Sequence, residues 1–181
     1  MRGVNFSGML RAARRRFGDE AAERIVAGVG GEIGAQLRKQ RIAITDWYPV
    51  SAYDALLASI ERELPGVEAA IRELSRAQVV DDLSGLFRAL TFVVSPDFAL
   101  VNASRAAALY WDGGRVSVVR ADAETLHFRF SGYDGFTRRC WEDFAGGVEG
   151  VMEAMRLGRL ETRVVVGEQI SDCDVIVRYR T

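Results

Sequence analysis

The apolar residues of positions 1–112 recur at steps of three and four, which is the spacing of amphipathic helices. The first helix is predicted from Asn5, a good N-cap residue, to Phe17, and Gly18 ends it. Further helices are predicted at 19–27, in a short piece ending near 39, at 52–64 with Ser51 as its cap, at 67–94 with a break near 77–82, and after Pro96. The amino-terminal part is therefore predicted to be helical.

Beyond Gly114 the hydrophobic period changes from helical to two. Val116 and Val118 alternate with polar neighbours, and so do the apolar residues of 126–130. A long helix is predicted at 136–157, followed by strands at 160–166 and 175–179 that are joined by a turn at 170–174. We therefore expect an α+β fold in one domain, in which a helical part (1–112) precedes a sheet-containing part (113–181). The sheet should have four antiparallel strands with the long helix across one face.

Composition and charge restrict the classes of partner and the cellular location that we expect. The chain has 181 residues, of which 49% are hydrophobic and 27% charged, so it can bury one sizeable core. A formal net charge of −1 gives no general attraction to nucleic acid. No apolar run approaches the roughly 20 residues of a membrane span, and the amino terminus does not read as a secretory signal. We expect a cytoplasmic protein that binds neither nucleic acid nor membrane.

Five short runs of residues, in their order and approximate spacing, are similar to a known family. They are Met1-Arg2-Gly3-Val4 before a helix that ends in Phe17-Gly18, Tyr48-Pro49-Val50-Ser51 at a helix start, Leu126-His127-Phe128 in a strand, Arg139-Cys140 at the start of the long helix, and Val177-Arg178-Tyr179 in the last strand. Together they resemble haem nitric-oxide/oxygen-binding (H-NOX) domains. H-NOX domains share a superfamily with four-vinyl-reductase-type ligand-binding domains and vesicle-tethering TRAPP subunits. The resemblance covers nearly the whole chain.

The sequence departs from this family at the positions that the resemblance implies for haem. H-NOX domains bind the haem iron through a helix histidine, and they hold the propionates with a Tyr-x-Ser-x-Arg strand motif whose side chains share one face. Here the three motif positions are Phe128, Phe130 and Gly132, and the axial position lies near Asn102. These residues supply neither an iron ligand nor charge-assisted hydrogen bonds to buried carboxylates. We predict a haem-less member without a cofactor.

The former pocket then has two alternatives, which the sequence leaves open. Either Phe128, Phe130 and neighbouring aromatic residues fill it, which we favour, or it still admits an apolar small molecule. His127, the one histidine of the chain, lies on the polar side of its strand and is expected to be solvated rather than a ligand.

The two cysteines, Cys140 and Cys173, lie at the starts of the long helix and of the last strand. In some H-NOX members, cysteines at these two places build a zinc or thiol redox site. Residues 161–166 supply no further cysteine or histidine, so we predict no metal site. A redox pair remains an alternative to two ordinary buried thiols, which we favour.

The remaining charged and aromatic groups have ordinary interpretations. The arginines at 11 and 14–16, with Arg2, either form a basic face for a partner or, as we favour, end a solvated helix and pair with the acidic residues of 19–23. Adjacent carboxylates do not converge on a helix, so Asp81-Asp82 and Glu142-Asp143 are predicted to be surface charges. The three tryptophans are expected in the core: Trp47, Trp111 and Trp141.

The sequence therefore predicts a non-enzymatic signalling or ligand-binding module that acts on a signalling protein in trans. An apolar small-molecule ligand is compatible with it, and a homodimer is expected by analogy with superfamily members. The first alternative is a haem or gas sensor with an atypical axial ligand such as Cys140 or His127. An enzyme is disfavoured because no nucleophile with a base and an orienting group can be named. A structural subunit of a larger assembly is a further alternative.

Overall fold

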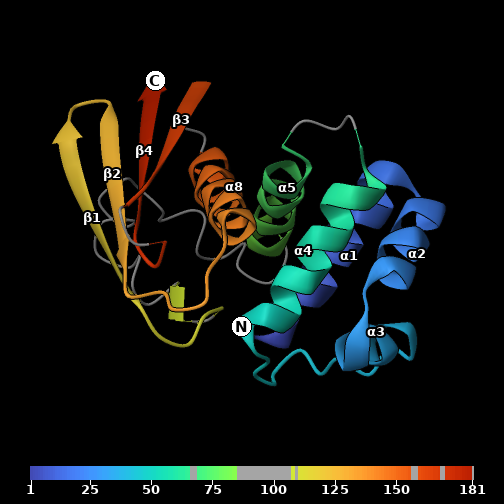
Figure 1. The fold of residues 1–181 in the computed structure, drawn as a ribbon. Helices are drawn as coiled ribbons and strands as arrows, with labels where there is room; N and C mark the ends of the chain where they lie inside the picture. The colour runs from blue at the N-terminus through green and yellow to red at the C-terminus, as the bar shows by residue number, and fades with distance from the viewer. Residues whose placement is uncertain (66–68, 85–106, 109, 156–158, 168–169, 181) are drawn as a thin grey trace.

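The computed structural model describes residues 1–65, 69–84, 107–108, 110–155, 159–167 and 170–180. Helices dominate the chain before the sheet, and one long helix separates two strand pairs (Figure 1). The elements are α1 (Gly3–Phe17), α2 (Asp19–Gly28), α3 (Gly31–Arg38), α4 (Val50–Glu63), α5 (Ala70–Ser84), β1 (Arg115–Asp122), β2 (Thr125–Ser131), α8 (Arg138–Ala154), β3 (Arg159–Val166) and β4 (Cys173–Arg180).

The four strands form one sheet in the order β1-β2-β4-β3, and every neighbouring pair is antiparallel. The chain makes one strand pair, passes through α8, and returns to place β4 beside β2. This is the predicted order of strand, strand, helix, strand, strand, and the α+β fold is confirmed. The alternation of apolar residues predicted it, because a half-buried strand needs an apolar residue at every second position.

Helix α8 lies between the sheet and the helical part, with α5 and α4 on its other side (Figure 1). Its buried residues accordingly point in several directions and include Trp141 and Phe144. Helix α8 also lies close to α5, because glycines of α8 face α5. A Cβ atom on Gly146 would lie 2.2 Å from the backbone oxygen of Arg72. A helix that is covered on both sides carries small and apolar residues around most of its circumference.

The two faces of the sheet differ sharply in chemistry. The face toward α8 is apolar and includes Leu126 and Val177, both fully buried. The opposite face carries residues such as His127 and Arg129, which pair across the strands with Val119 and Ser117. This division follows from the alternation of each strand, and it decides which side chains reach the interior.

Several predicted helix boundaries differ from those of the structure. Asn5 is not an N-cap but a buried residue inside α1, and its side-chain amide donates to the backbone oxygen of Tyr110 at 3.0 Å. Ser51 lies within α4, whose N-cap is Pro49. Helix α5 is continuous through 77–82, where a break was predicted. The predicted helical residues at 85–94 and 95–106 lie outside the described residues.

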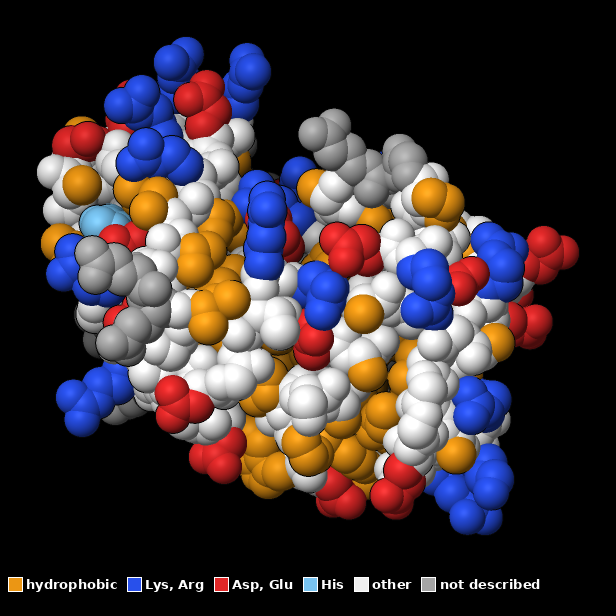
Figure 2. Space-filling model, viewed as in Figure 1, with side chains coloured by type: hydrophobic (Ala, Val, Ile, Leu, Met, Phe, Trp, Pro, Cys, Tyr) orange, Lys and Arg blue, Asp and Glu red, His pale blue; other side chains and the backbone are white. Residues whose placement is uncertain are grey.

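The arginine cluster of α1 (Arg11 and Arg14–Arg16) makes the predicted pairing with α2 through Arg14, and its other arginines pair with α5. Arg14 reaches Asp19, but Arg11 and Arg16 form ion pairs with Asp82 and Glu73 of α5 at 2.7 and 2.6 Å. Asp82 is thus an interhelical partner and not a free surface charge. Figure 2 shows basic and acidic side chains intermixed over the visible face.

In the described part of the chain, no helix has the length and apolar character to cross a membrane.

Candidate functional site

The strand positions that the resemblance assigns to haem binding lie at the centre of the molecule. Phe128 and Phe130 are on the face of β2 that α8 covers, and their exposed fractions are 5% and 3%. Cross-strand partners on β4 are Val175 for Phe128 and Cys173 for Phe130. Both rings are therefore part of the core, and neither presents a polar atom to it.

Phe130 belongs to a cluster of aromatic rings between the sheet and α8. Its ring centroid lies 4.8 Å from that of Phe144 and 6.0 Å from those of Tyr133 and Trp141. Trp111 stacks on Phe144 at 3.9 Å, nearly in parallel. Such ring contacts stabilise a core by about 1 kcal/mol each beyond the area that they bury. We call these residues, together with Phe136, the aromatic cluster.

The third motif position, Gly132, lies just beyond the end of β2. Its backbone φ of +70° is in the left-handed region, which costs other residues roughly 1–2 kcal/mol. Its N–H donates to the carboxylate of Asp172 at 2.9 Å, and the N–H of Tyr133 donates to the carbonyl of Ser171. The strand therefore turns away at the position where an arginine would extend it. Phe128, Phe130 and Gly132 do not fit the propionate grip that the resemblance implies.

The other residues named for haem are not brought to this place. Asn102 lies outside the described residues. His127 points from the outer face of the sheet, away from Phe128 and Phe130, and its Nε2 atom lies 3.3 Å from Asp174. The histidine is therefore partly buried and next to a carboxylate, whereas the sequence predicted a solvated side chain.

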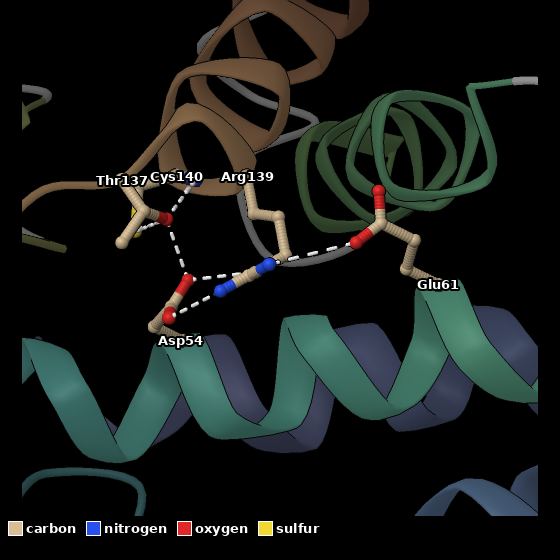
Figure 3. A network of polar contacts seen from close by, with 5 residues as sticks. All are labelled: Asp54, Glu61, Thr137, Arg139 and Cys140. Atoms are coloured by element: carbon tan, nitrogen blue, oxygen red, sulfur yellow. Dashed lines mark hydrogen bonds and ion pairs between the residues drawn. The ribbon is translucent and has the colours of Figure 1, made fainter.

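A polar network fixes the start of α8 to α4 (Figure 3). Thr137 caps α8 by accepting from the N–H of Cys140, and its hydroxyl donates to Asp54 of α4. The guanidinium of Arg139 donates to both carboxylate oxygens of Asp54, at 3.0 and 2.8 Å, and a further nitrogen lies 3.6 Å from Glu61. Bidentate pairs of this kind fix orientation as well as distance. The network therefore sets how the helical part meets α8.

Asp54→Asn is expected to reduce the free energy of unfolding by about 2 kcal/mol, because the half-buried Arg139 loses a charged partner. Burial would raise the pKa of Asp54, but the hydrogen bonds from Arg139 and Thr137 outweigh it and hold the pKa below its ordinary value. The stabilisation is then present above the ordinary pKa of an aspartate and is lost as the pH falls through the lowered one. Urea denaturation of both proteins at neutral and acidic pH measures the difference.

Glu61→Gln is the matched control, since Glu61 is 65% exposed and contacts the same guanidinium only at 3.6 Å. This variant should change the unfolding free energy by less than about 0.5 kcal/mol. Equal losses in the two variants would contradict the special role of Asp54.

Asp143 is a buried carboxyl group that sequence reasoning missed. It was predicted to be a surface charge, but it is 4% exposed, on the side of α8 that faces α4 and α5. The hydroxyl of Tyr53 donates to its carboxyl group, and Ser75 donates to its backbone oxygen at 2.7 Å. Burial raises the pKa of Asp143 to about 7, against the opposing effect of its hydroxyl partners. The small residues of α8 at 145–147 were the available sequence signal for a second packed face.

The two cysteines are free thiols in different surroundings. Cys140 lies on α8 next to Thr137, and Cys173 lies on the inner face of β4. Burial raises the pKa of Cys140 to about 11 and that of Cys173 to about 12, each with a smaller contribution from nearby carboxylates. Reactive thiols have lowered pKa values, so these environments favour two structural thiols over a redox pair. The described residues contain no group of three or more metal-ligating side chains placed to hold an ion.

The tryptophans occupy three different environments. Trp141 is fully buried, and its indole N–H donates to the backbone oxygen of Ile170 at 2.7 Å. Trp111 is partly buried against the core, as predicted. Trp47 was predicted in the core but is 45% exposed.

Comparison with solved structures shows that the whole chain has the H-NOX fold. The Fe(II) unliganded H-NOX protein from K. algicida matches with a TM-score of 0.70 at 15% identity, over 100% of this chain and 97% of that one. A mutant of the same protein matches with a TM-score of 0.73 at 12% identity, over 100% and 97%. A Tt H-NOX variant matches with a TM-score of 0.70 at 16% identity, over 100% and 96%. At these identities the likeness establishes the fold alone.

No protein-family model matches the sequence, and a search of curated proteins found no match.

Proposed function

We propose that this chain is a haem-independent signalling or ligand-binding module on an H-NOX-like scaffold, without enzymatic activity, that acts by contacting a partner protein in trans. The packing of Phe130 into the aromatic cluster carries the proposal. Where the resemblance implies a hydroxyl that binds a haem propionate, a phenyl ring lies 4.8 Å from Phe144 and is 3% exposed. A carboxylate brought to this place would be desolvated without a donor, which costs several kcal/mol.

The rest of the scaffold supports a role in conformational signalling. Helix α8 contacts β2 through the rings of Trp141 and Phe130, α4 through Arg139 and α5 through Gly146. A change at the sheet or at the helical part is therefore passed to the other side through one helix. We propose that the partner that senses this change is a signalling protein. We also propose that this chain assembles as a homodimer.

The first test is the ultraviolet-visible spectrum of the protein purified from cells supplied with a haem precursor and then titrated with haemin. The expected result is no stoichiometric Soret band, because the motif positions offer no donors to the propionates. An H-NOX protein expressed in parallel is the positive control for haem supply. Native mass spectrometry of the same sample would detect a co-purified small molecule.

A stoichiometric Soret band would overturn the proposal and favour the alternative, a sensor with an atypical axial ligand. The variants His127→Ala and Cys140→Ser would then identify the ligand. His127 lies on the outer sheet face beside Asp174, whereas Cys140 lies in the interior at the start of α8. Loss of the band in one variant only would assign the iron ligand.

A further inference from the structure

A cavity of about 530 Å³ opens where β1 begins and β2 ends. It lies beside the aromatic cluster and not within it. Of the rings in the cluster, Trp111 and Tyr133 line the cavity and the others do not. Its volume is in the range of small-molecule sites. The side chains that matter for recognition are Trp47, Trp111, Tyr133, Arg115, Arg129 and Ser131.

The apolar wall of the cavity is built from aromatic rings that the fold holds in place. Trp47 is bridged to the backbone of Arg2, whose guanidinium lies 5.1 Å from the centre of its ring. Trp111 is stacked on Phe144. Tyr133 is packed so closely against Gly114 that a Cβ atom there would lie 2.5 Å from the tyrosine ring. Because these rings are positioned before any ligand arrives, an apolar body can bind without ordering them.

The polar wall comes from the outer face of the sheet. Arg115 is directly opposite Ser131, and Ser117 is directly opposite Arg129, so the two arginines occupy diagonal positions on one face. Diagonal neighbours have Cβ atoms about 7–8 Å apart, close enough for both guanidinium groups to reach one anion. Asp112 is the one carboxylate among the described lining residues, so the lining carries a net positive charge.

The side chains of both arginines are available to a ligand. Arg129 is 62% exposed and lies 3.6 Å from Asp174, a distance typical of a weak, solvated ion pair. Arg115 is exposed at the start of β1. The hydroxyl of Ser131, directly across from Arg115, adds a neutral donor to the same lining.

We propose that this cavity binds an organic anion with a flat apolar body, whose carboxylate or sulfonate contacts Arg115 and Arg129 while its body packs against Trp47, Trp111 and Tyr133. This inference rests on the proposed function and deepens it, since it gives the chemical class of the ligand. Guanidinium groups bind such anions with charge-assisted hydrogen bonds, and the aromatic rings exclude water from the body.

The test uses a matched pair of fluorescent probes, anilinonaphthalene sulfonate and the uncharged phenylnaphthylamine, which share an aromatic body and differ in the anionic group. The folded full chain is titrated with each probe. We expect saturable binding of the sulfonate, and a roughly tenfold weaker affinity in Arg115→Gln and in Arg129→Gln. The uncharged probe should bind these variants and the wild type equally. Arg163→Gln, an exposed arginine on β3, is the control and should bind both probes as the wild type does.

Two results would overturn this inference. One is the absence of saturable sulfonate binding, and the other is an equal effect of all three arginine variants. Neither result depends on haem: a Soret band in the earlier experiment would refute the haem-independent proposal by itself. If neither a Soret band nor saturable sulfonate binding were observed, partner binding would remain the proposed function and the cavity would have no role in it.

Discussion

Gly146→Ala is expected to lower the free energy of unfolding by about 3 kcal/mol, because overpacking at a helix contact cannot be relieved by rotating a side chain. The added Cβ atom would lie 2.2 Å from the backbone oxygen of Arg72 and 2.9 Å from the Cβ atom of Ser75. Helices α5 and α8 would have to separate, and the separation would disturb the buried contacts between them. Urea denaturation monitored by circular dichroism measures the change as a lower midpoint at constant slope.

Gly147→Ala is the control on the same helix. The nearest atom to its added Cβ would be the Ser75 hydroxyl at 3.8 Å, which is an ordinary contact. Alanine favours helix by up to about 1 kcal/mol relative to glycine, so this variant should be as stable as the wild type or more stable. If both variants lost the same stability, the close approach of α5 and α8 would not be the cause.

Asp143→Asn is expected to remove a pH dependence of stability and to make the protein more stable than the wild type above pH 7. The pKa of Asp143 is raised to about 7 in the folded state, first by burial, so the folded protein binds a proton that the unfolded chain releases near pH 4. The stabilisation that this proton gives the folded protein is complete below the pKa of Asp143 in the unfolded chain. It is lost as the pH rises through the pKa of Asp143 in the folded protein. The wild type should lose about 4 kcal/mol over this range.

The measurement is the unfolding free energy of both proteins at several pH values between about 4 and 8, the range set by the two pKa values. Asparagine is nearly isosteric and stays neutral, so its curve should lack the decline. Glu142→Gln changes the next residue, which is ion-paired with Arg72 outside the buried cluster, and should retain the wild-type decline. Parallel curves for the wild type and Asp143→Asn would show that Asp143 is ionised in the folded protein near neutral pH.

The sheet was more predictable than the helical part, for a physical reason. In β2 and β4 a buried residue alternates with a more exposed one, so the segment at 126–130 shows its period in five residues. Helix starts depend on whichever group satisfies the first N–H groups. Asn5 looks like a cap, but its side chain contacts Tyr110, which is distant in sequence and has no local signature.

The burial of Phe128 and Phe130 was predicted, but the residues around them were not. Phe128 and Phe130 are where the strand period puts them, under α8. Asp143 was missed because the divergence of adjacent carboxylates on a helix was taken to place both on the surface, whereas α8 is covered on two sides and buries one of them. The cavity was missed as well, since it combines Trp47 with Arg115 and Arg129, and no sequence pattern links a loop before α4 to two strands of the sheet.

The position of β4 affects how the chain folds during its synthesis. Strand β4 is synthesised after the other three strands of the sheet, yet it pairs with both β2 and β3 in the middle of the sheet. Until residues 173–180 leave the ribosome, β2 can pair only with β1, and the apolar rings of Phe128 and Phe130 lie beside an unpaired strand edge. Such edges promote association with other chains. A nascent chain that is stalled before β4 is synthesised should therefore be a substrate for chaperones, whereas synthesis of residues 173–180 supplies the pairings with β2 and β3 together.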